Sequence, residues 1–198
     1  MLLPDGYSDV PQGKIAAVVT ALEMKARPAA RPDPDPAPWR LATVERPDLG
    51  WYRDLWRRIG EDWLWFSRLQ MSDAKLAAIL HDPAVAVHAL EADGRAEGLL
   101  ELDFREAGRC ELAFFGITQP HLGTGAGRWL MNRAIELAWS RPIGRFWVHT
   151  CTLDHPGALA FYMRSGFVPF HRQVEIADDP RLLGQVPLTA AAHVPVIR

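Results

Sequence analysis

The chain has little cysteine, no long apolar run and no large excess of charge of either sign. Its 198 residues include two cysteines, Cys110 and Cys151, which are too few for a disulfide framework and form no zinc-binding pattern. A transmembrane helix needs about 18 consecutive apolar residues, and the sequence contains no such run. We therefore expect no membrane span and no metal site. The cysteine content favours a reducing cytoplasm.

The balance of charge also limits the partners. A formal net charge of −2 gives no electrostatic case for binding nucleic acid or an anionic membrane. The opening segment MLLPDGYSDVPQGK lacks the charged region and apolar core of a signal peptide. We therefore expect a cytoplasmic protein without a nucleic-acid or membrane partner.

The length suits one domain with its own hydrophobic core. Residues 15–24 are apolar and predict an added strand, whereas five prolines within residues 28–38 predict an extended connector. We divide the chain into an N-terminal extension at 1–38, a main domain at 39–178 and a C-terminal tail at 179–198. The added strand could wrap the same domain or reach a neighbouring subunit, so a homodimer stays open.

Local patterns predict the elements of the main domain. Helix starts are marked by Pro47-Asp48, by Ser72 as an N-cap and by Pro156, and Gly166 marks a helix end. Turns at Asp93-Gly94 and Ala107-Gly108 separate three strands. The predicted elements are strands at 39–45, 85–92, 98–105, 110–118, 146–151 and 167–176, and helices at 48–59, 73–81, 125–140 and 156–165. Their order, βααβββαβαβ, predicts an α/β fold of the α+β type, with a mixed, mainly antiparallel sheet flanked by helices.

The segment CELAFFGITQPHLGTGAGR, residues 110–128, is the most informative about a ligand. Gly123, Gly125 and Gly127 lie between a predicted strand and a predicted amphipathic helix. Glycines leave backbone N–H groups uncovered, and a helix N-terminus adds unpaired donors and a positive dipole end. This arrangement favours a phosphate or pyrophosphate ligand. A turn that only caps the helix is the alternative.

The two common nucleotide-binding motifs do not fit this segment. A P-loop ends in Gly-Lys-Ser/Thr, and neither residue type follows the glycines here. A dinucleotide fingerprint reads G-x-G-x-x-G with an acidic residue about 20 positions later. This chain reads G-x-G-x-G and has Arg145, Phe146 and Trp147 in place of the acid.

Two motifs in order resemble the GNAT acetyltransferase superfamily. The family's pyrophosphate loop reads Gln/Arg-x-x-Gly-x-Gly/Ala, and Leu122-Gly123-Thr124-Gly125-Ala126-Gly127 matches it except at the first position. A later family signature reads Asn-x-x-Ala-x-x-hydrophobic-Tyr followed by Gly-Phe. Residues 155–162, HPGALAFY, and then Gly166-Phe167 match it, with His155 in place of the Asn. The resemblance covers residues 39–170.

The resemblance implies acetyl-CoA, or a related acyl-CoA, as the donor, and no metal. In family members the pantetheine arm lies between two strands that part from each other, which here maps to the main chain of Phe115 and Ile117 opposite residues 146–151. The pyrophosphate would bind N–H groups of residues 122–128. The implied donor-binding residues are Phe115, Gly116, Ile117, Leu122, Gly123, Thr124, Gly125, Ala126, Gly127, Arg128, His155 and Phe161.

Acetyl transfer to an amine needs a base for the ammonium proton and an acid for the leaving thiolate. The resemblance implies Tyr162 as the general acid. It also favours Glu111 as the base, because family members often carry a carboxylate on this strand. Without a bulge, Glu111 shares a face with Phe115. Glu101 and His155 are alternative bases.

A covalent acyl-enzyme is a further alternative for the chemistry. Cys151 could be the nucleophile, with His149 or His155 activating it. We disfavour it, because family members usually transfer the acyl group directly.

The predicted function is therefore an N-acetyltransferase that moves an acetyl group from acetyl-CoA to a primary amine of a small molecule or peptide by direct transfer. The alternative is a non-catalytic acyl-CoA-binding sensor or partner-binding module. Acidic and aromatic residues mix in the segment 60–70, and this mixture suits a cationic amine on a partly apolar body. Core packing would explain the same aromatic residues.

Overall fold

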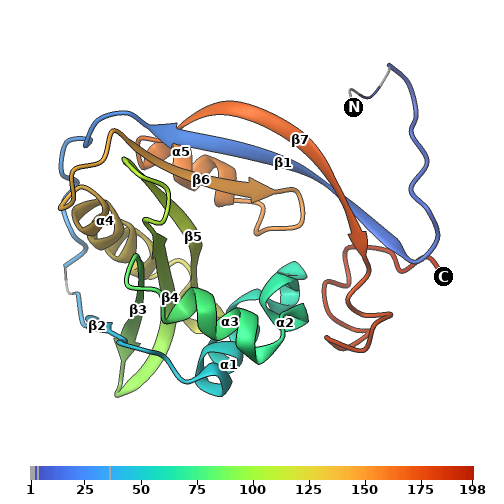
Figure 1. Ribbon diagram of the computed structural model, residues 1–198, viewed down its shortest axis with the longest axis horizontal. Coiled ribbons are helices and arrows are strands. Elements are labelled where there is room, and N and C mark those ends of the chain that lie inside the picture. The colour runs from blue at the N-terminus through green and yellow to red at the C-terminus, as the bar shows by residue number, and fades with distance from the viewer. Residues whose placement is uncertain (1–2, 4, 36) are drawn as a thin grey trace.

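The computed structural model describes residue 3, residues 5–35 and residues 37–198. Residues 1, 2, 4 and 36 of the predicted extension lie outside the described residues. In the described part, seven strands form one sheet in the order β2-β3-β4-β5-β6-β1-β7 (Figure 1). The strands are β1 Lys14–Met24, β2 Arg40–Thr43, β3 Val85–Ala92, β4 Arg95–Asp103, β5 Arg109–Ile117, β6 Arg145–Cys151 and β7 Val168–Asp178.

All neighbouring strands pair antiparallel except β5 and β6, which pair parallel. The α-helices are α1 Leu49–Gly60, α2 Ser67–Gln70, α3 Asp73–Leu80, α4 Ala126–Ala138 and α5 Ala158–Arg164, and the 3-10 helices are η1 Glu61–Trp63 and η2 Gln119–His121. This mixed sheet flanked by helices confirms the predicted fold class. The four-residue α2 was not predicted.

Most predicted element ends are confirmed by their local contacts. The Asp48 carboxylate accepts a hydrogen bond from the Trp51 N–H at 2.8 Å, and the Ser72 hydroxyl accepts from the Lys75 N–H at 3.4 Å. These contacts satisfy N–H groups that the first turn of a helix leaves unpaired. Gly166, at φ +103°, lies directly after the C-cap residue of α5 and ends this helix, as predicted.

Two starts differ from the prediction by more than one residue. Strand β4 begins three residues earlier than expected, because Asp93 and Gly94 both have positive φ and form a tight turn that lets β3 and β4 pair up to it. Helix α5 begins at Ala158 instead of Pro156. The Gly157 N–H donates to the His155 ring at 3.0 Å and the Ala158 N–H donates to the His155 carbonyl at 2.8 Å, so a turn closed by His155 precedes the helix.

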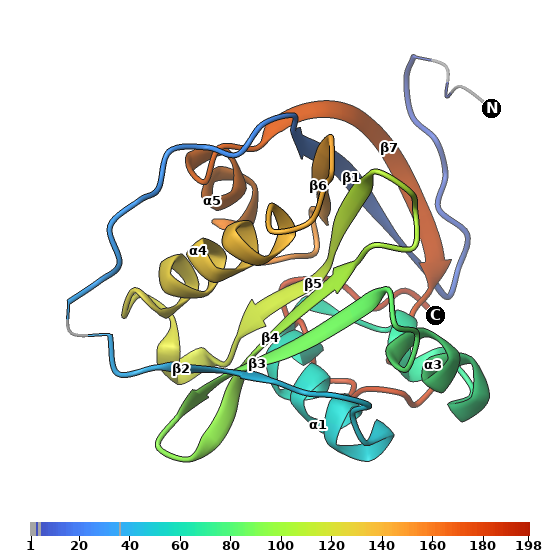
Figure 2. The same ribbon diagram turned by 60° about the vertical axis from the view of Figure 1, so that its left-hand side comes forward.

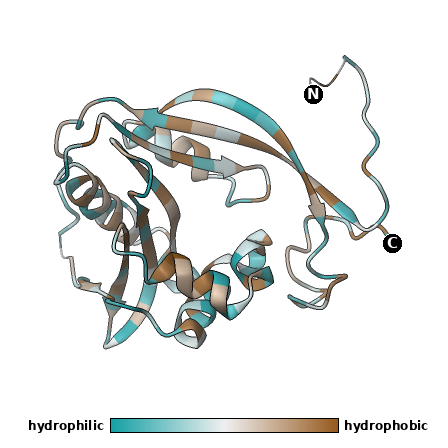
Figure 3. Cartoon of the chain, in the orientation of Figure 1, coloured by the Kyte–Doolittle hydropathy of each residue, from teal (hydrophilic) through white to brown (hydrophobic). Residues whose placement is uncertain are grey.

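Helices cover both faces of the sheet. Helices α1 and α3 lie on one side, and α4 and α5 lie on the other (Figure 2). The central strands β4 and β5 between these layers are largely hydrophobic (Figure 3). Side chains of β4 alternate between the two faces, because Leu100 and Leu102 pack in the core under α4, whereas Leu99 packs in the core under α1 and α3.

Strand β1 lies inside the sheet, between β6 and β7 (Figure 1). It pairs with β6 from Val19↔Cys151 to Met24↔Phe146, and with β7 from Lys14↔Asp178 to Glu23↔Val168. Residues 14–24 of the N-terminal extension are therefore an interior strand of the same sheet as residues 39–178. The side chain of Leu22 is fully buried in the core under α4.

The segment after β7 packs against β1. Val186 and Ala190 share a small core with Ile15 and Ala17. The buried Arg181 side chain holds this segment together, because it donates to the Asp179 carboxylate at 2.7 Å and to the Val194 carbonyl at 2.8 Å. The C-terminal tail thus covers one face of strand β1.

The interior position of β1 predicts its contribution to stability. Leu22→Ala should lower the free energy of unfolding by about 3 kcal/mol, since it leaves a cavity in the core. Val18→Ala on the same strand should cost less than about 1 kcal/mol, because Val18 is exposed. Urea unfolding of both variants measures the difference. Equal and small losses would contradict an integral β1.

Candidate active site

Strands β5 and β6 part from each other in the middle of the sheet. They pair at three positions only, Arg109↔Arg145, Cys110↔Phe146 and Glu111↔Trp147. Beyond Glu111, β5 has no strand partner on this side within the described residues. A cavity of about 570 Å³ occupies the region between the strands. Unpaired backbone groups facing a cavity can bind an extended ligand in the way a neighbouring strand would.

The glycine turn lies at one end of this cavity. Gly123, Gly125 and Gly127 all line it, and φ is +77° at Gly123 and +99° at Gly125. These two glycines therefore have a backbone conformation that other residues rarely adopt. Within the described residues, the N–H groups of Gly123, Gly127 and Arg128 donate to no protein acceptor. The first turn of α4 thus presents free donors, which favours an anion.

An aromatic cluster lies next to the turn. The rings of Phe115 and Phe161 stack at 5.7 Å, and Tyr162 meets both rings edge-on at 6.3 Å and 5.7 Å. All three residues line the cavity. Burial raises the pKa of Tyr162, with the charge of Asp154 adding to the effect. The phenol is therefore kept protonated, as a proton donor must be.

The donor-binding residues expected from the resemblance are brought together, with two exceptions. Thr124 and Ala126 do not line the cavity. The Thr124 hydroxyl instead donates to the His121 carbonyl at 2.8 Å and supports the turn. The residues that do line it are Phe115, Gly116, Ile117, Leu122, Gly123, Gly125, Gly127, Arg128, His155 and Phe161.

A β-bulge decides which way Glu111 faces. The register of β4 and β5 shifts between Glu101↔Phe114 and Leu102↔Leu112, which leaves Ala113 as the extra residue. The condition for Glu111 to share a face with Phe115 is therefore not met. Glu111 lies on the face of Phe114, the side covered by α1 and α3, whereas Phe115 lies on the side of α4 and α5.

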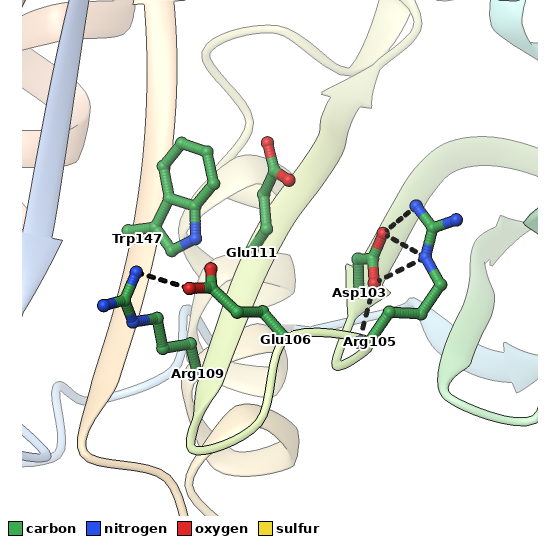
Figure 4. A pocket seen from close by; sticks show the side chains of 6 residues that line it. All are labelled: Asp103, Arg105, Glu106, Arg109, Glu111 and Trp147. Carbon is green, nitrogen blue, oxygen red and sulfur yellow. Dashed lines mark hydrogen bonds and ion pairs between the residues drawn. The ribbon is translucent and has the colours of Figure 1, made fainter.

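Glu111 lines a separate pocket of about 440 Å³ next to Trp147 (Figure 4). The other charged groups around it are paired, Asp103 with Arg105 and Glu106 with Arg109. Glu111 does not line the cavity between β5 and β6. Its expected role as the base that touches the acceptor therefore requires an intermediary.

His149 lies where such an intermediary would stand. Its Nδ1 lies 3.4 Å from the Glu111 Oε1, and its half-exposed side chain lines the larger cavity. Hydrogen bonding to Glu111 raises the pKa of His149. Because Glu111 accepts a hydrogen bond from the Nδ1–H group, the neutral ring keeps Nε2 as a proton acceptor. The sequence named His149 only as a partner for Cys151, since the register of β5 against β6 could not be read from it.

The alternative bases are engaged elsewhere. The Glu101 carboxylate is fully buried and accepts hydrogen bonds from Tyr52 and Arg68, so both oxygens are occupied. It does not line the larger cavity. His155 accepts the Gly157 N–H at its Nδ1, and a ring that accepts at Nδ1 carries its proton on Nε2. His155 thus closes the turn before α5.

Cys151 also lines the cavity but is a poor nucleophile. Burial raises the pKa of its thiol to about 11. At neutral pH about one thiol in 10⁴ is then ionised, and the thiolate is the reactive form. The geometry thus favours direct transfer over a covalent acyl-enzyme.

Part of the cavity lining is an aromatic wall. Trp63, Trp65 and Phe66 from the segment after α1 line the cavity together with Phe114. Gly60 makes the wall possible, because a Cβ there would lie 2.3 Å from the Trp65 ring. Trp65 donates from its ring N–H to Asp154 at 3.1 Å, and Asp154 and Glu175 add acidic groups to the lining. Neither acid was identified from the sequence.

The described residues hold no group of three or more histidine, cysteine or acidic side chains placed to bind a metal ion. None of their helices has both the length and the apolar character needed to cross a membrane.

Residues 49–167 match the model of the acetyltransferase (GNAT) family. The chain belongs to this family. No protein of curated function matches it in sequence. The GNAT assignment agrees with the parted strands, the glycine turn and Tyr162, which sequence motifs alone had indicated.

Solved structures share the GNAT fold at low sequence identity. A putative GNAT acetyltransferase from Novosphingobium aromaticivorans is 14% identical, with a TM-score of 0.57, over 84% of this chain and 67% of that one. A GCN5-related N-acetyltransferase from Kribbella flavida is 20% identical, with a TM-score of 0.54, over 87% of this chain. The chain spans 63% of the Kribbella protein's length.

A third similar structure is an aminoglycoside acetyltransferase from an uncultured soil metagenomic sample. It is 14% identical, with a TM-score of 0.53, over 66% of this chain and 89% of that chain. At these identities the likeness concerns the fold and not the acceptor.

The contact between His149 and Glu111 predicts a pH effect. Glu111→Gln should lower the pKa of His149, because the hydrogen bond to a carboxylate and its opposite charge are removed. The pair stabilises the fold below pH ~6.5, the unfolded pKa of histidine, and this stabilisation is lost as the pH rises through the higher folded pKa. The variant should therefore be less stable than the native protein at a pH below ~6.5 and equally stable at a pH above the folded pKa.

NMR titration of the histidine rings measures this shift directly. His88, whose pKa burial lowers, is the internal control and should not move. An unchanged His149 titration would show that Glu111 does not hold the ring.

Proposed function

We propose that this GNAT-family chain is an N-acetyltransferase that moves an acetyl group from acetyl-CoA to a primary amine of a small molecule or peptide. The observation that supports this proposal is a single cavity lined by the glycine turn, Tyr162, His149 and the aromatic wall. A donor with a phosphate end and an extended arm fits its first half. The second half leaves room for an acceptor beside the base.

The residues present fit acetyl-CoA. Gly123 has open space where a side chain would stand, and the N–H groups of Gly127 and Arg128 are free to bind a pyrophosphate. The unpaired edge of β5 at Phe115 and Ile117 suits the amide groups of a pantetheine arm. When bound, acetyl-CoA supplies a thioester whose acyl group can be transferred to a nucleophile.

His149 and Tyr162 divide the proton transfers. His149 takes a proton from the acceptor ammonium at Nε2, and Glu111 acts as a positioning residue that holds the ring and stabilises its charged form. The amine nitrogen then bonds to the acyl carbon as the carbon–sulfur bond breaks. Tyr162 donates its hydroxyl proton to the leaving sulfur. As the amide forms, its nitrogen loses a second proton to solvent, the Tyr162 phenolate takes a proton back from solvent, and His149 releases the first proton, so that no covalent enzyme intermediate is needed.

The acceptor end suits a primary ammonium on a flat apolar body. The rings of Trp63, Trp65 and Phe66 offer apolar area and cation–π faces. Asp154 and Glu175 supply negative charge near the ammonium. Two acidic groups are few for a polycationic acceptor such as an aminoglycoside. We therefore favour a monoamine with an aromatic or aliphatic body. Cytoplasmic location and a homodimer stay predictions.

Calorimetric titration with acetyl-CoA, free CoA, NAD and ATP tests the donor. Selective binding of the two CoA species is the expected result, because only they combine a pyrophosphate with a pantetheine arm. Thiol release with a panel of monoamines then tests turnover. Absence of binding to either CoA species would contradict the proposal and reduce the glycine turn to a helix cap.

Replacing Tyr162 separates an enzyme from a non-catalytic acyl-CoA sensor. Tyr162→Phe should lower kcat by about 10²-fold or more while the affinity for acetyl-CoA stays within about twofold, since only the proton donor is lost. Tyr52→Phe is the matched control; its hydroxyl contacts Glu101 outside the cavity, and kcat should not fall. A sensor would show no turnover in the native protein and no effect of either change.

His149→Gln tests the base. The rate constant kcat/KM should fall by about 10²-fold at pH 7, and the rise of rate with pH that reports His149 should disappear. His171→Gln on the exposed strand β7 is the control. If kcat/KM and its pH profile survive in the His149 variant, Glu111 acts through water instead.

A further inference from the structure

The segment after α1 contains a turn in which leucine stands at a position that usually holds glycine. The Leu64 N–H donates to the Glu61 carbonyl at 3.1 Å, and the Trp65 N–H donates to the Gly60 carbonyl at 3.0 Å. These two bonds form a Schellman motif, whose left-handed residue is most often glycine. Here that residue is Leu64, with φ +51° and ψ +39°. A residue with a Cβ is strained in this conformation, so contacts from outside the turn must hold Leu64 there.

The C-terminal tail supplies these contacts. The Leu64 side chain is 2% exposed and belongs to the same small core as Val186 of the tail. Phe66, from the same segment, packs against this core. The side-chain amide of Gln70 donates to the side-chain oxygen of Gln185 at 3.2 Å, which places the tail beside α2 (Figure 1). The tail therefore packs against the segment that carries the strained turn.

The tail has a fixed shape of its own. The buried Arg181 side chain donates to the carbonyls of Ala190 at 3.2 Å and Val194 at 2.8 Å, so residues on both sides of the small core are tied together. Burial of an apolar side chain is favourable and can offset the strain of the backbone that places it. The position of Leu64 is thus stabilised from the tail, since the turn alone disfavours it.

The same turn aims two rings of the aromatic wall. Trp63 and Trp65, the neighbours of Leu64 in sequence, both line the cavity. The backbone angles of Leu64 therefore set the direction of one ring relative to the other. If Leu64 relaxed to an ordinary conformation, the Trp65 N–H would leave the Gly60 carbonyl. The Trp65 ring N–H would also leave Asp154, to which it donates at 3.1 Å.

We propose that the C-terminal tail is part of the acceptor site, with Leu64 and Val186 as positioning residues that hold the aromatic wall in the form that binds the amine. Residues 179–198 do not line the cavity themselves. They act through the turn at Leu64. This inference rests on the proposed acetyl transfer to a monoamine. It assigns a role in acceptor binding to a segment outside the family match at residues 49–167.

Two replacements of Leu64 distinguish positioning from packing. Leu64→Ala loses the buried contacts and keeps a Cβ in the strained conformation, so KM for a monoamine should rise about tenfold. Leu64→Gly loses one carbon more, but glycine adopts a positive φ freely, so KM should rise less than about threefold. In both variants kcat and the affinity for acetyl-CoA should stay within about twofold, because only acceptor binding is changed. An equal or larger rise in KM for the glycine variant would show packing alone and overturn the proposal.

Val186→Ala tests the tail itself. The smaller side chain leaves a gap in the small core, and KM for the monoamine should rise about fivefold while kcat and the affinity for acetyl-CoA are unchanged. Leu188→Ala is the matched control, because Leu188 lies in the same tail and is 54% exposed. Its KM should stay within about twofold of the native value. Equal effects of the two replacements, or no effect of Val186→Ala, would overturn the role of the tail.

Hydrogen exchange of the Trp65 amide gives a second reading that needs no turnover. This N–H should exchange about tenfold faster in Leu64→Ala and Val186→Ala than in the native protein, because the turn opens more often, and at the native rate in Leu188→Ala. If the native protein acetylates no amine, the proposed function fails. Faster exchange would then still support the tail as the holder of the turn, whereas unchanged exchange in Val186→Ala would overturn that role as well.

Discussion

The early end of the pairing between β5 and β6 is the constraint on which the site depends. Parallel pairing stops after three positions, and hydrogen-bonding groups of β5 are left for a ligand. The same divergence opens the region that the glycine turn, Tyr162 and His149 border. A sheet with complete pairing here would be more regular and would have no place for a donor.

The bulge at Ala113 completes this arrangement by separating two tasks. It places Phe115 on the side of α4 and α5, with Tyr162, and Glu111 on the opposite side, with His149. The side chains that we propose as proton donor and proton acceptor, Tyr162 and His149, thus lie on opposite sides of one strand gap. One inserted residue is enough for this, because side chains alternate between the faces of a strand.

The sequence predicted what local chemistry determines. Asp48, Ser72 and Gly166 mark their helix ends through their own side chains or φ angles, and Asp93-Gly94 marks its turn in the same way. The glycine turn and the segment around Tyr162 were recognised because their residues are consecutive. The bulge and the contact between Glu111 and His149 depend on pairings between distant segments. No local pattern determines such pairings.

The interior position of β1 has a consequence for how the protein is made. Its partners β6 and β7 begin more than 100 residues later in the chain. During synthesis the first strand therefore leaves the ribosome long before either neighbour exists. Both of its edges stay unpaired until β6 and β7 have also emerged. Contacts of such large sequence separation slow folding. The last step in forming the sheet should accordingly be the pairing of β6 and β7 with β1.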